Sequence, residues 1–216
     1  MAAPMTATAV AHSNIALIKY WGKRSERLNL PAVGSISITL KELSTWTRVT
    51  FQEDLGPDRV RLNGRKATPE ETRRVSAFLD IVRRMAGRPL GAQVVSKNNF
   101  PTGAGLASSA SGFAALALAA TAALGLELPP TRLSALARLG SGSAARSVFG
   151  GFVEMQRGQA ADGSDACAIQ LRDEHFWPLE VLVLVTAEGP KSIGSTRAMN
   201  LTADTSPYFP AWVENQ

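Results

Sequence analysis

Alternating polar and apolar residues predict a sheet in the first third of the chain. Residues 35–40 and 46–51 each alternate with a period of two, the pattern of a strand that buries one face. Turn-forming residues at 54–58 lead into a third short apolar run at 60–62. The dipeptide Asn63-Gly64 that follows is a strong turn signal. These runs predict an antiparallel meander.

A helical pattern begins directly after this meander. Thr68 has the character of an N-cap, Pro69 suits the first helical position, and Glu71 completes a capping box. Apolar residues then recur with the spacing of one buried helix face, and Gly87 ends the pattern. The apolar positions are Val75, Phe78, Leu79 and Val82.

The middle of the chain predicts a strand, a small-residue loop and a buried helix. Residues 92–96 read as a strand, and residues 113–124 form an Ala-rich run that is apolar nearly all round. Pro129 and Pro130 open a further helix that ends near Gly140.

The last third is expected to complete one domain and to begin another. Residues 152–156 and 166–171 predict strands, 179–186 a long apolar strand, and 202–215 a helix. Residues 1–10 are expected to form an irregular start. The pattern as a whole indicates an α+β chain with domains at 1–177 and 178–216.

The loop before the Ala-rich helix has the composition of a phosphate cradle. Gly103 and Gly105 allow a close approach of the backbone, and Ser108 and Ser109 add hydroxyls where a helix begins. No Walker lysine and no third Rossmann glycine accompany them. The alternative is a glycine-rich connector whose serines cap a core helix.

Two further segments carry groups suited to anions. Residues 19–24 bring Lys19 and Lys23 beside Tyr20 and Trp21, and the alternative there is a strand end with a solvated basic turn. Residues 141–147 again place hydroxyls before a helix start, with Arg146 able to grip a carboxylate or a phosphate at two points. The alternative for this segment is a tight link between helices.

Composition limits the classes of function. The 216 residues carry a net charge of +5, but lysine and arginine are scattered rather than gathered in a basic stripe, so nucleic acid is not an expected partner. The single cysteine, Cys167, excludes an intrachain disulfide and suits a reducing compartment. No apolar run approaches a membrane span, and the chain is expected to be cytoplasmic.

Three motifs carry a resemblance to a known family. The string Pro101-x3-Gly105-Leu106-x-Ser108-Ser109-Ala110 resembles the ATP-binding motif of the GHMP kinase superfamily. Asn14-Ile15-Ala16-x-x-Lys19-Tyr20-Trp21-Gly22-Lys23-Arg24 and Leu28-Asn29-Leu30-Pro31 are similar to the N-terminal motif of the diphosphomevalonate decarboxylases. The run Gly140-Ser141-Gly142-Ser143-Ala144-Ala145-Arg146-Ser147 looks like the substrate segment of that family.

The resemblance implies a fold and a reaction. The fold is a GHMP kinase-like pair of domains, with a ribosomal protein S5 domain 2-like N-terminal domain and the start of a ferredoxin-like C-terminal domain. The reaction is the ATP-dependent conversion of mevalonate 5-diphosphate to isopentenyl diphosphate through 3-phosphorylation. It would require ATP and Mg²⁺, and members of the family are usually homodimers.

It also implies roles for individual residues. Catalysis would involve Lys19, Ser108 and Arg146, with Ser108 and Ser109 near the Mg²⁺ that ATP carries. The substrate would contact Tyr20, Lys23, Ser141, Ser143, Arg146 and Ser195. ATP would contact Trp21, Ser96, Asn98, Pro101, Gly103, Ala104, Gly105, Leu106, Ala107, Ser108 and Ser109.

The resemblance is incomplete in one respect. Family members are longer, and their catalytic aspartate lies in a later segment that no residue of this chain matches. We therefore expect a truncated form with weak or no turnover. The alternatives are a phosphomevalonate decarboxylase or another small-molecule kinase of the superfamily and, from a different class, a non-catalytic nucleotide-binding fragment.

Overall fold

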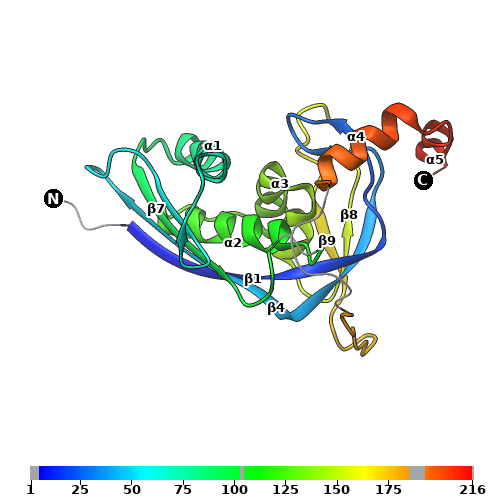
Figure 1. The fold of residues 1–216 in the computed structure, drawn as a ribbon, viewed down its shortest axis with the longest axis horizontal. Coiled ribbons are helices and arrows are strands. Elements are labelled where there is room, and N and C mark those ends of the chain that lie inside the picture. Colours follow the sequence, from blue (N-terminus) through cyan, green and yellow to red (C-terminus); the bar gives the residue numbers. More distant parts are fainter. Residues whose placement is uncertain (1–4, 103–104, 185–192, 216) are drawn as a thin grey trace.

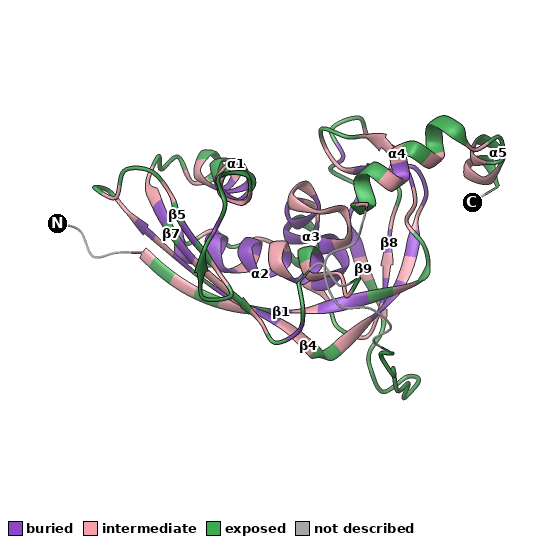
Figure 2. Cartoon of the chain, viewed as in Figure 1, coloured by how far each residue is buried: buried purple, intermediate pink, exposed green. Residues whose placement is uncertain are grey.

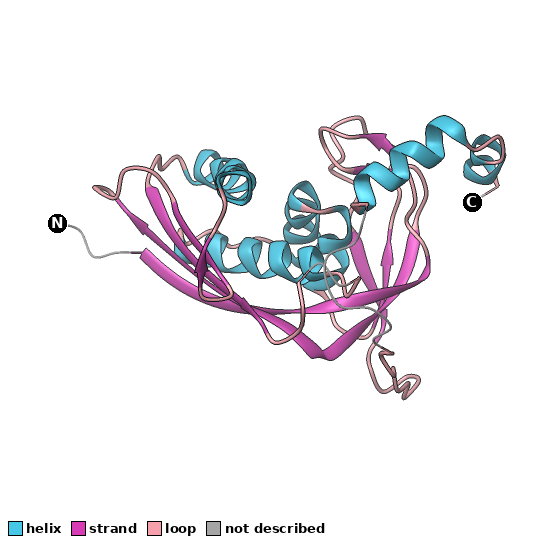
Figure 3. Cartoon of the chain, in the orientation of Figure 1, coloured by secondary structure: helices cyan, strands magenta, loops and turns pink. Residues whose placement is uncertain are grey.

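The computed structural model describes residues 5–102, 105–184 and 193–215 of the chain (Figure 1). In chain order its strands are β1 (Met5–Ile18), β2 (Lys23–Ser25), β3 (Leu30–Pro31), β4 (Ser35–Gln52), β5 (Arg59–Leu62), β6 (Arg65–Lys66), β7 (Gly91–Asn98), β8 (Phe152–Met155) and β9 (Ala168–Arg172). Its helices are α1 (Pro69–Ala86), α2 (Ser108–Ala123), α3 (Pro130–Gly140), α4 (Ser195–Thr205) and α5 (Phe209–Glu214), with a 3-10 helix η1 (Gly142–Val148) after α3. The helices α1, α2 and α3 lie on one face of a curved sheet (Figure 3).

The long strand β4 organises this sheet. One of its edges pairs antiparallel with β1, from Ile36 opposite Ile18 to Phe51 opposite Met5. The other edge is divided, because residues 35–38 pair with β8 and residues 45–52 pair with β7. The alternating runs predicted as two strands are therefore one strand of 18 residues.

The prediction of an irregular start is wrong for residues 5–10, which belong to β1. Their sequence alternates threonine with alanine, so the hydrophobic contrast is weak. Pairing with β4 supplies the missing order, and Ala7 and Ala9 pack against the main core. The strand is fixed by this partner rather than by its own pattern.

The predicted meander is also wrong. The strand order is β6-β5-β7-β4, so β7 lies between β5 and β4, and β5 pairs with β7 in parallel. Local turn signals fix where the chain reverses but not which strand becomes the neighbour. Helix α1 carries the chain back across the sheet, and the apolar β7, with Ala92 and Val94 buried, takes the interior position.

The main core lies between the sheet and the helices. The prediction that the Ala-rich helix is buried is confirmed, since its alanines at 114, 115, 117, 119 and 120 are fully inaccessible (Figure 2). Side chains this small let the α2 backbone pack close to the sheet. The capping box of Thr68 and Glu71 on α1 is likewise confirmed.

The C-terminal part departs from the predicted strand. Residues 173–184 form neither helix nor strand, so the strand predicted at 179–186 is wrong for 179–184, and 185–186 lie outside the described residues. Leu182 is 84% exposed, and no neighbouring strand pairs with this stretch in the described chain. Phe176 and Trp177 pack on Phe152 of β8.

The helix predicted at 202–215 is in fact two helices, α4 and α5, and α4 begins seven residues earlier, at Ser195. The two helices are separated at residues 206–208, just before Pro210. In the part of the chain that is described, no helix combines the length and the apolar character needed to cross a membrane.

A buried ion pair joins the start of β5 to α1 and β7. Arg83 pairs with Asp58, and their side chains are only 11% and 7% exposed. Asp58 Oδ1 also accepts the Ala92 N–H at 2.9 Å, and Arg83 Nε donates to the Leu90 carbonyl at 2.7 Å. Arg83 pairs in addition with Asp80, which is 53% exposed.

We expect Asp58→Ala to lower the free energy of unfolding by about 3–5 kcal/mol, because it leaves the Arg83 charge buried without its buried partner. The matched control Asp80→Ala removes the exposed partner of the same arginine and should cost about 1 kcal/mol or less. Urea denaturation of the three proteins measures both values. Equal losses in the two variants would contradict this account.

Candidate functional site

The start of α2 is the centre of the candidate site. Its N-cap is Ala107, whose backbone is left-handed at φ 53°, and no side chain caps the helix. The capping of the helix by these serines, which the alternative of a glycine-rich connector included, is therefore wrong. Ser109 is exposed and Ser108 half-buried in the first turn, where backbone N–H groups and the positive end of the helix dipole favour anions.

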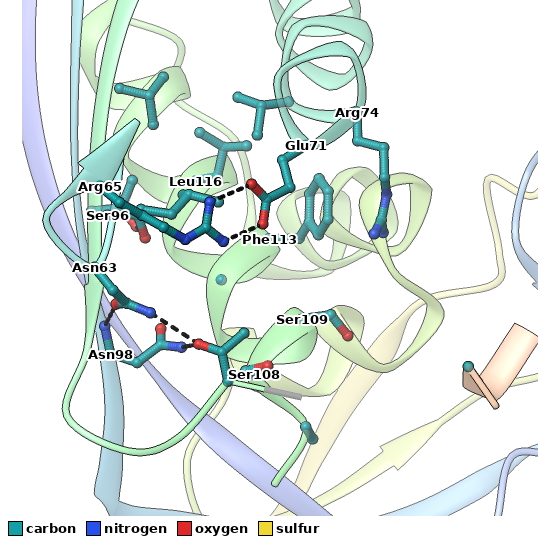
Figure 4. Close-up of a pocket in the computed structure, with 18 of the residues that line it drawn as sticks. Asn63, Arg65, Glu71, Arg74, Ser96, Asn98, Ser108, Ser109, Phe113 and Leu116 are labelled. Atoms are coloured by element: carbon teal, nitrogen blue, oxygen red, sulfur yellow. Dashed lines mark hydrogen bonds and ion pairs between the residues drawn. The ribbon is translucent and has the colours of Figure 1, made fainter. Parts of the chain in front are cut away.

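A cavity of about 490 Å³ opens in front of this helix start (Figure 4). One part of its lining is apolar and contains Phe113 and Leu116, near Arg65 and Glu71. Ser108 and Ser109 lie below them in the view of Figure 4. The apolar lining residues are Leu62, Val75, Val94, Phe113 and Leu116. The polar or charged ones are Thr47, Asn63, Arg65, Glu71, Arg74, Ser96, Asn98, Thr102, Ser108, Ser109 and Ser195.

An ion pair closes one side of the cavity. Both terminal nitrogens of Arg65 donate to Glu71, at 2.8 and 2.6 Å, and Glu71 also accepts the Thr68 N–H at 2.8 Å. The hydrogen bonds from Arg65, opposed by some desolvation and assisted by Thr68, lower the pKa of Glu71 to about 2. Arg74 lies over the ring of Phe113, 5.4 Å from its centroid.

The first turn of α2 also adjoins the second small-residue segment. Ser109 Oγ lies 3.4 Å from Ser141 Oγ, which lies 3.3 Å from Ser143 Oγ. Gly142 between them is in close contact with Tyr20, since a Cβ there would lie 2.5 Å from the ring. Hydroxyls from two separate helix starts thus gather at one place beside Tyr20.

Tyr20 brings an unsatisfied hydroxyl to this place. Its oxygen is buried and finds no hydrogen-bond partner among the described residues. Burial, partly offset by the charges of Arg146 and Arg138, raises the pKa of Tyr20 to about 12. The phenol is therefore neutral and free to donate to an acceptor that is not part of the described chain.

Arg146 is a buried cation held by neutral groups. It is 3% exposed, and its terminal nitrogens donate to Ser35 Oγ at 2.6 Å and to Asn14 Oδ1 at 3.1 Å. Its Nε is also buried without a partner in the described part of the chain. Burial, slightly opposed by Tyr20, lowers the pKa of Arg146 to about 10. The guanidinium stays charged at neutral pH and can still pair with an anion.

Lys23, three residues after Tyr20, connects the loop before β3 to α4. Its ammonium donates to Asn29 Oδ1 at 2.7 Å and, at 3.4 Å, to the hydroxyl of Thr196, the neighbour of the cavity-lining Ser195. Burial lowers the pKa of Lys23; the charge of Glu26 opposes this effect and that of Arg74 adds to it. The charge of Arg74 thus contributes to the lowered pKa of Lys23.

The structure gathers most, but not all, of the residues predicted from the sequence. The cavity is lined by Ser96, Asn98, Gly105, Ala107, Ser108, Ser109 and Ser195. The adjoining cluster contains Tyr20, Ser141, Ser143 and Arg146. Lys23 lies near it in the chain and contacts Thr196, the neighbour of the cavity-lining Ser195. Trp21, Pro101 and Leu106 do not line the cavity, and Lys19 is exposed after the end of β1. Gly103 and Ala104 lie outside the described residues.

Sequence reasoning did not select several residues that the fold brings to the site. They are Asn14, Ser35, Asn63, Arg65, Glu71 and Arg74. Asn14 belonged to a recognised motif, and Asn63 to a turn signal. Glu71 belonged to the predicted capping box, but nothing there indicated a place in the site. Ser35, Arg65 and Arg74 had no local signal, because their place depends on how the strands and α1 pack together.

Fold and site define the class of this protein. The chain has the GHMP kinase fold, as predicted, because it superimposes on mevalonate diphosphate decarboxylases of that fold. The serine-lined helix start that faces the cavity is consistent with this class. The family model described as diphosphomevalonate decarboxylase-like N-terminal domain matches residues 11–168. The chain belongs to this family.

Proteins similar to this chain in sequence include diphosphomevalonate decarboxylases of other organisms. The chain is 45% identical to the human diphosphomevalonate decarboxylase, over 94% of this chain and 54% of that protein. It is 41% identical to the Saccharomyces cerevisiae diphosphomevalonate decarboxylase, over 97% of this chain and 57% of that protein. It thus spans about half the length of these relatives.

Solved structures are similar over nearly the whole chain. Mevalonate diphosphate decarboxylase from Staphylococcus aureus matches with a TM-score of 0.88 and 41% identity, covering 98% of this chain and 64% of that one. The enzyme from Enterococcus faecalis matches with a TM-score of 0.86 and 41% identity, covering 99% and 64%. A structure of MDDEF in complex with MVAPP, AMPPCP and magnesium has a TM-score of 0.87 and 40% identity, covering 99% and 65%.

The Arg65–Glu71 pair predicts a specific dependence of stability on pH. Folding lowers the pKa of Glu71 from 4.5 to about 2, so its carboxylate stabilises the fold above pH 4.5, and this contribution is lost as the pH falls toward 2. Glu71→Gln should cost about 1 kcal/mol at pH 7 through the lost ion pair with Arg65, because the glutamine oxygen can still accept the Thr68 N–H. The difference from the unmodified protein should shrink across that acidic range.

Urea denaturation between pH 7 and pH 3 measures this difference. Glu70→Gln is the matched control, because Glu70 lies in the same first turn of α1 but is not the residue that pairs with Arg65. A gap between the unmodified protein and Glu71→Gln that stays constant with pH would contradict the assignment.

Proposed function

We propose that this chain binds ATP and mevalonate 5-diphosphate and belongs to an ATP-dependent decarboxylase that forms isopentenyl diphosphate. The observation that carries the proposal is that the cavity and the adjoining cluster around Tyr20 meet at the start of α2. Ser109 lines the cavity, and its hydroxyl lies 3.4 Å from that of Ser141 in the cluster with Tyr20 and Arg146. A phosphoryl donor bound in the cavity would therefore lie next to an acceptor bound in the cluster.

The cavity suits a nucleotide. Its apolar lining, with Phe113 and Leu116, offers surface for a base, and its polar lining ends at the first turn of α2, where phosphates are favoured. The structure of MDDEF in complex with MVAPP, AMPPCP and magnesium supports this reading, because AMPPCP is an ATP analogue. We assign ATP contacts to the predicted residues that line the cavity. Trp21, Pro101 and Leu106, together with Gly103 and Ala104, have no such support.

The adjoining cluster suits an acid that carries phosphates. Tyr20 offers a neutral donor, Arg146 and Lys23 offer charge, and Ser141 and Ser143 offer hydroxyls. We assign Arg146 to the carboxylate of mevalonate 5-diphosphate, because a planar guanidinium matches a carboxylate at two points. Lys19, exposed beside Tyr20, is assigned to the outer phosphate oxygens, and Ser195 to the cavity side of the substrate.

The proposed chemistry follows from the substrate. Its tertiary 3-hydroxyl is a poor leaving group. When that oxygen attacks the γ-phosphorus of ATP, the hydroxyl proton passes to a base or to solvent and ADP leaves, so that the oxygen becomes part of a phosphate, which is a good leaving group. The carbon–oxygen bond then breaks with loss of inorganic phosphate, and positive charge develops at C3. The bond to the carboxylate breaks next, its electron pair forms the double bond, and carbon dioxide leaves. The chain contributes positioning and charge stabilisation.

Magnesium fits this donor set through the nucleotide. The described residues hold no cluster of three or more acidic, histidine or cysteine side chains that could bind a metal alone. Ser108 and Ser109 offer hydroxyl oxygens beside the place assigned to the phosphates, as suits an ion bound mostly by phosphate and water. When bound, Mg²⁺ would neutralise phosphate charge.

We further propose a cytoplasmic homodimer whose domains divide near residue 177. Support for a reducing compartment comes from Cys167, a buried free thiol. Support for the domain division comes from the sheet, whose last strand, β9, ends at Arg172. The homodimer rests on the resemblance to the family.

The first test measures binding and turnover with the 216-residue chain. Calorimetry with ATP and Mg²⁺, and separately with mevalonate 5-diphosphate, should show binding of both ligands. Release of labelled carbon dioxide should be weak or absent, because the family's catalytic aspartate has no counterpart in the sequence. Failure to bind either ligand would contradict the proposal, and tighter binding of mevalonate 5-phosphate would favour a phosphomevalonate decarboxylase.

Tyr20→Phe distinguishes an effect on ligand binding from an effect on the stability of the fold. Removing the hydroxyl takes away a buried oxygen without a partner, so the free energy of unfolding should stay the same or rise by about 1 kcal/mol. Loss of the donor should weaken binding of mevalonate 5-diphosphate about tenfold. Binding of ATP should change little. Calorimetry and urea denaturation of the same sample measure both effects, and a large loss of stability would contradict this role.

A further inference from the structure

Backbone strain is concentrated at the candidate site. Among the described residues, the non-glycine residues with positive φ are Asn29 at 50°, Asn63 at 49° and Ala107 at 53°. Asn63 and Ala107 line the cavity, and Asn29 holds Lys23. This conformation costs an L-residue of order 1 kcal/mol, so it persists only where other interactions enforce it.

Glycine would satisfy the backbone at lower cost. The chain does use glycine at nine other described positions with positive φ, Gly64 directly after Asn63 among them. Asparagine tolerates this conformation better than other non-glycine residues, so the turns account for the backbone at both positions but not for the contacts of the two side chains. Each asparagine side chain makes two hydrogen bonds that glycine could not make.

The Asn29 side chain connects α3 to Lys23. Its amide nitrogen donates to the carbonyl of Leu139 at 2.9 Å, and its oxygen accepts from the Lys23 ammonium at 2.7 Å. Arg138, itself 2% exposed, fixes the same loop by donating to the carbonyl of Leu28 at 3.1 Å. The ammonium of Lys23 is thus anchored to the last turn of a core helix.

The Asn63 side chain plays the corresponding part on the cavity side (Figure 4). Its oxygen accepts the Asn98 N–H at 2.8 Å, and its amide nitrogen donates to the Thr102 hydroxyl at 2.9 Å. The Asn98 side chain donates to the same hydroxyl at 2.9 Å. The β5–β6 turn is thereby fastened to the chain that leaves β7 toward the start of α2.

We propose that Asn29 and Asn63 are positioning residues, one for each half of the site. Asn29 holds the Lys23 ammonium for the phosphorylated substrate, and Asn63 holds the segment at Thr102 for the nucleotide phosphates. This inference rests on the proposed function for the identity of the two ligands. The assignment of each asparagine to one half of the site rests only on its hydrogen bonds and does not depend on the ligands.

The test crosses two variants with two ligands. Asn29→Gly and Asn63→Gly remove the side chains but keep a residue that adopts positive φ without strain. Calorimetry uses mevalonate 5-diphosphate and, separately, ATP with Mg²⁺. Asn29→Gly should weaken the diphosphate three- to tenfold, in proportion to about one lost hydrogen bond, and leave ATP within twofold. Asn63→Gly should show the reverse, and each variant serves as the control for the other.

A second readout follows Lys23 without any ligand. Acetic anhydride labels only unprotonated amines, and mass spectrometry compares the labelling rate of Lys23 with that of the exposed Lys19 in the same sample. Asn29→Gly removes an acceptor from the ammonium, so Lys23 should be labelled several-fold faster while Lys19 is unchanged. Asn29→Asp keeps an acceptor and tolerates positive φ, so it should restore slow labelling.

The outcomes separate the two proposals. If the unmodified chain binds neither ligand, the proposed function fails, and Lys23 labelling still decides the role of Asn29. If the unmodified chain binds both ligands and the two variants lose them equally or not at all, the positioning roles are overturned. Unchanged labelling of Lys23 in Asn29→Gly would overturn the role of Asn29 by itself.

Discussion

The divided edge of β4 is the constraint on which the site depends. Since β7 and β8 pair with different parts of one edge, the chain must leave the sheet between them, and α2 begins there. Thr45 fixes this point: it is fully buried, it donates to Asn98 Oδ1 at 2.8 Å, and its oxygen lies 2.7 Å from the Ser111 hydroxyl. With its only proton given to Asn98, Thr45 must accept from Ser111, so β4, β7 and α2 are joined by hydroxyls in the dry interior.

The positive charge of Arg146 is held by neutral groups, so no carboxylate of the described chain neutralises it. Arg146 is buried against Ser35 and Asn14, which orient its guanidinium without neutralising it. Had a carboxylate taken that place, the pair would have been satisfied, and an anionic ligand would have had to compete with it. Arg65 is the opposite case, because Glu71 occupies both of its terminal nitrogens. By this criterion we propose different roles for the two arginines: Arg65 shapes the cavity, and Arg146 binds an anionic ligand.

What the sequence predicted well depends on local physics. The capping box at Thr68 and the all-apolar α2 involve residues within a few positions of one another, and the small-residue loops mark helix starts in the same way. The errors share another cause. Residues 5–10 became a strand, residues 179–184 did not, and β7 separated β5 from β4, all through the presence or absence of a distant pairing partner. Arg65 and Arg74 were missed for the same reason, since they reach the cavity only once α1 has crossed the sheet.

The two anionic ligands that we propose would bind beside one helix start, where the folded chain already carries buried positive charge. Lys23 and Arg146 both have a lowered pKa, and burial is the principal cause in each, so the folded chain carries cations in places that disfavour charge. Neutral acceptors, Asn29 for the lysine and Asn14 with Ser35 for the arginine, reduce this cost without cancelling the charge. A bound anion would remove the remainder. Under the proposed function, the stability that the free chain loses by burying these charges would return as binding affinity. This would account for cations held by amides and hydroxyls rather than by carboxylates.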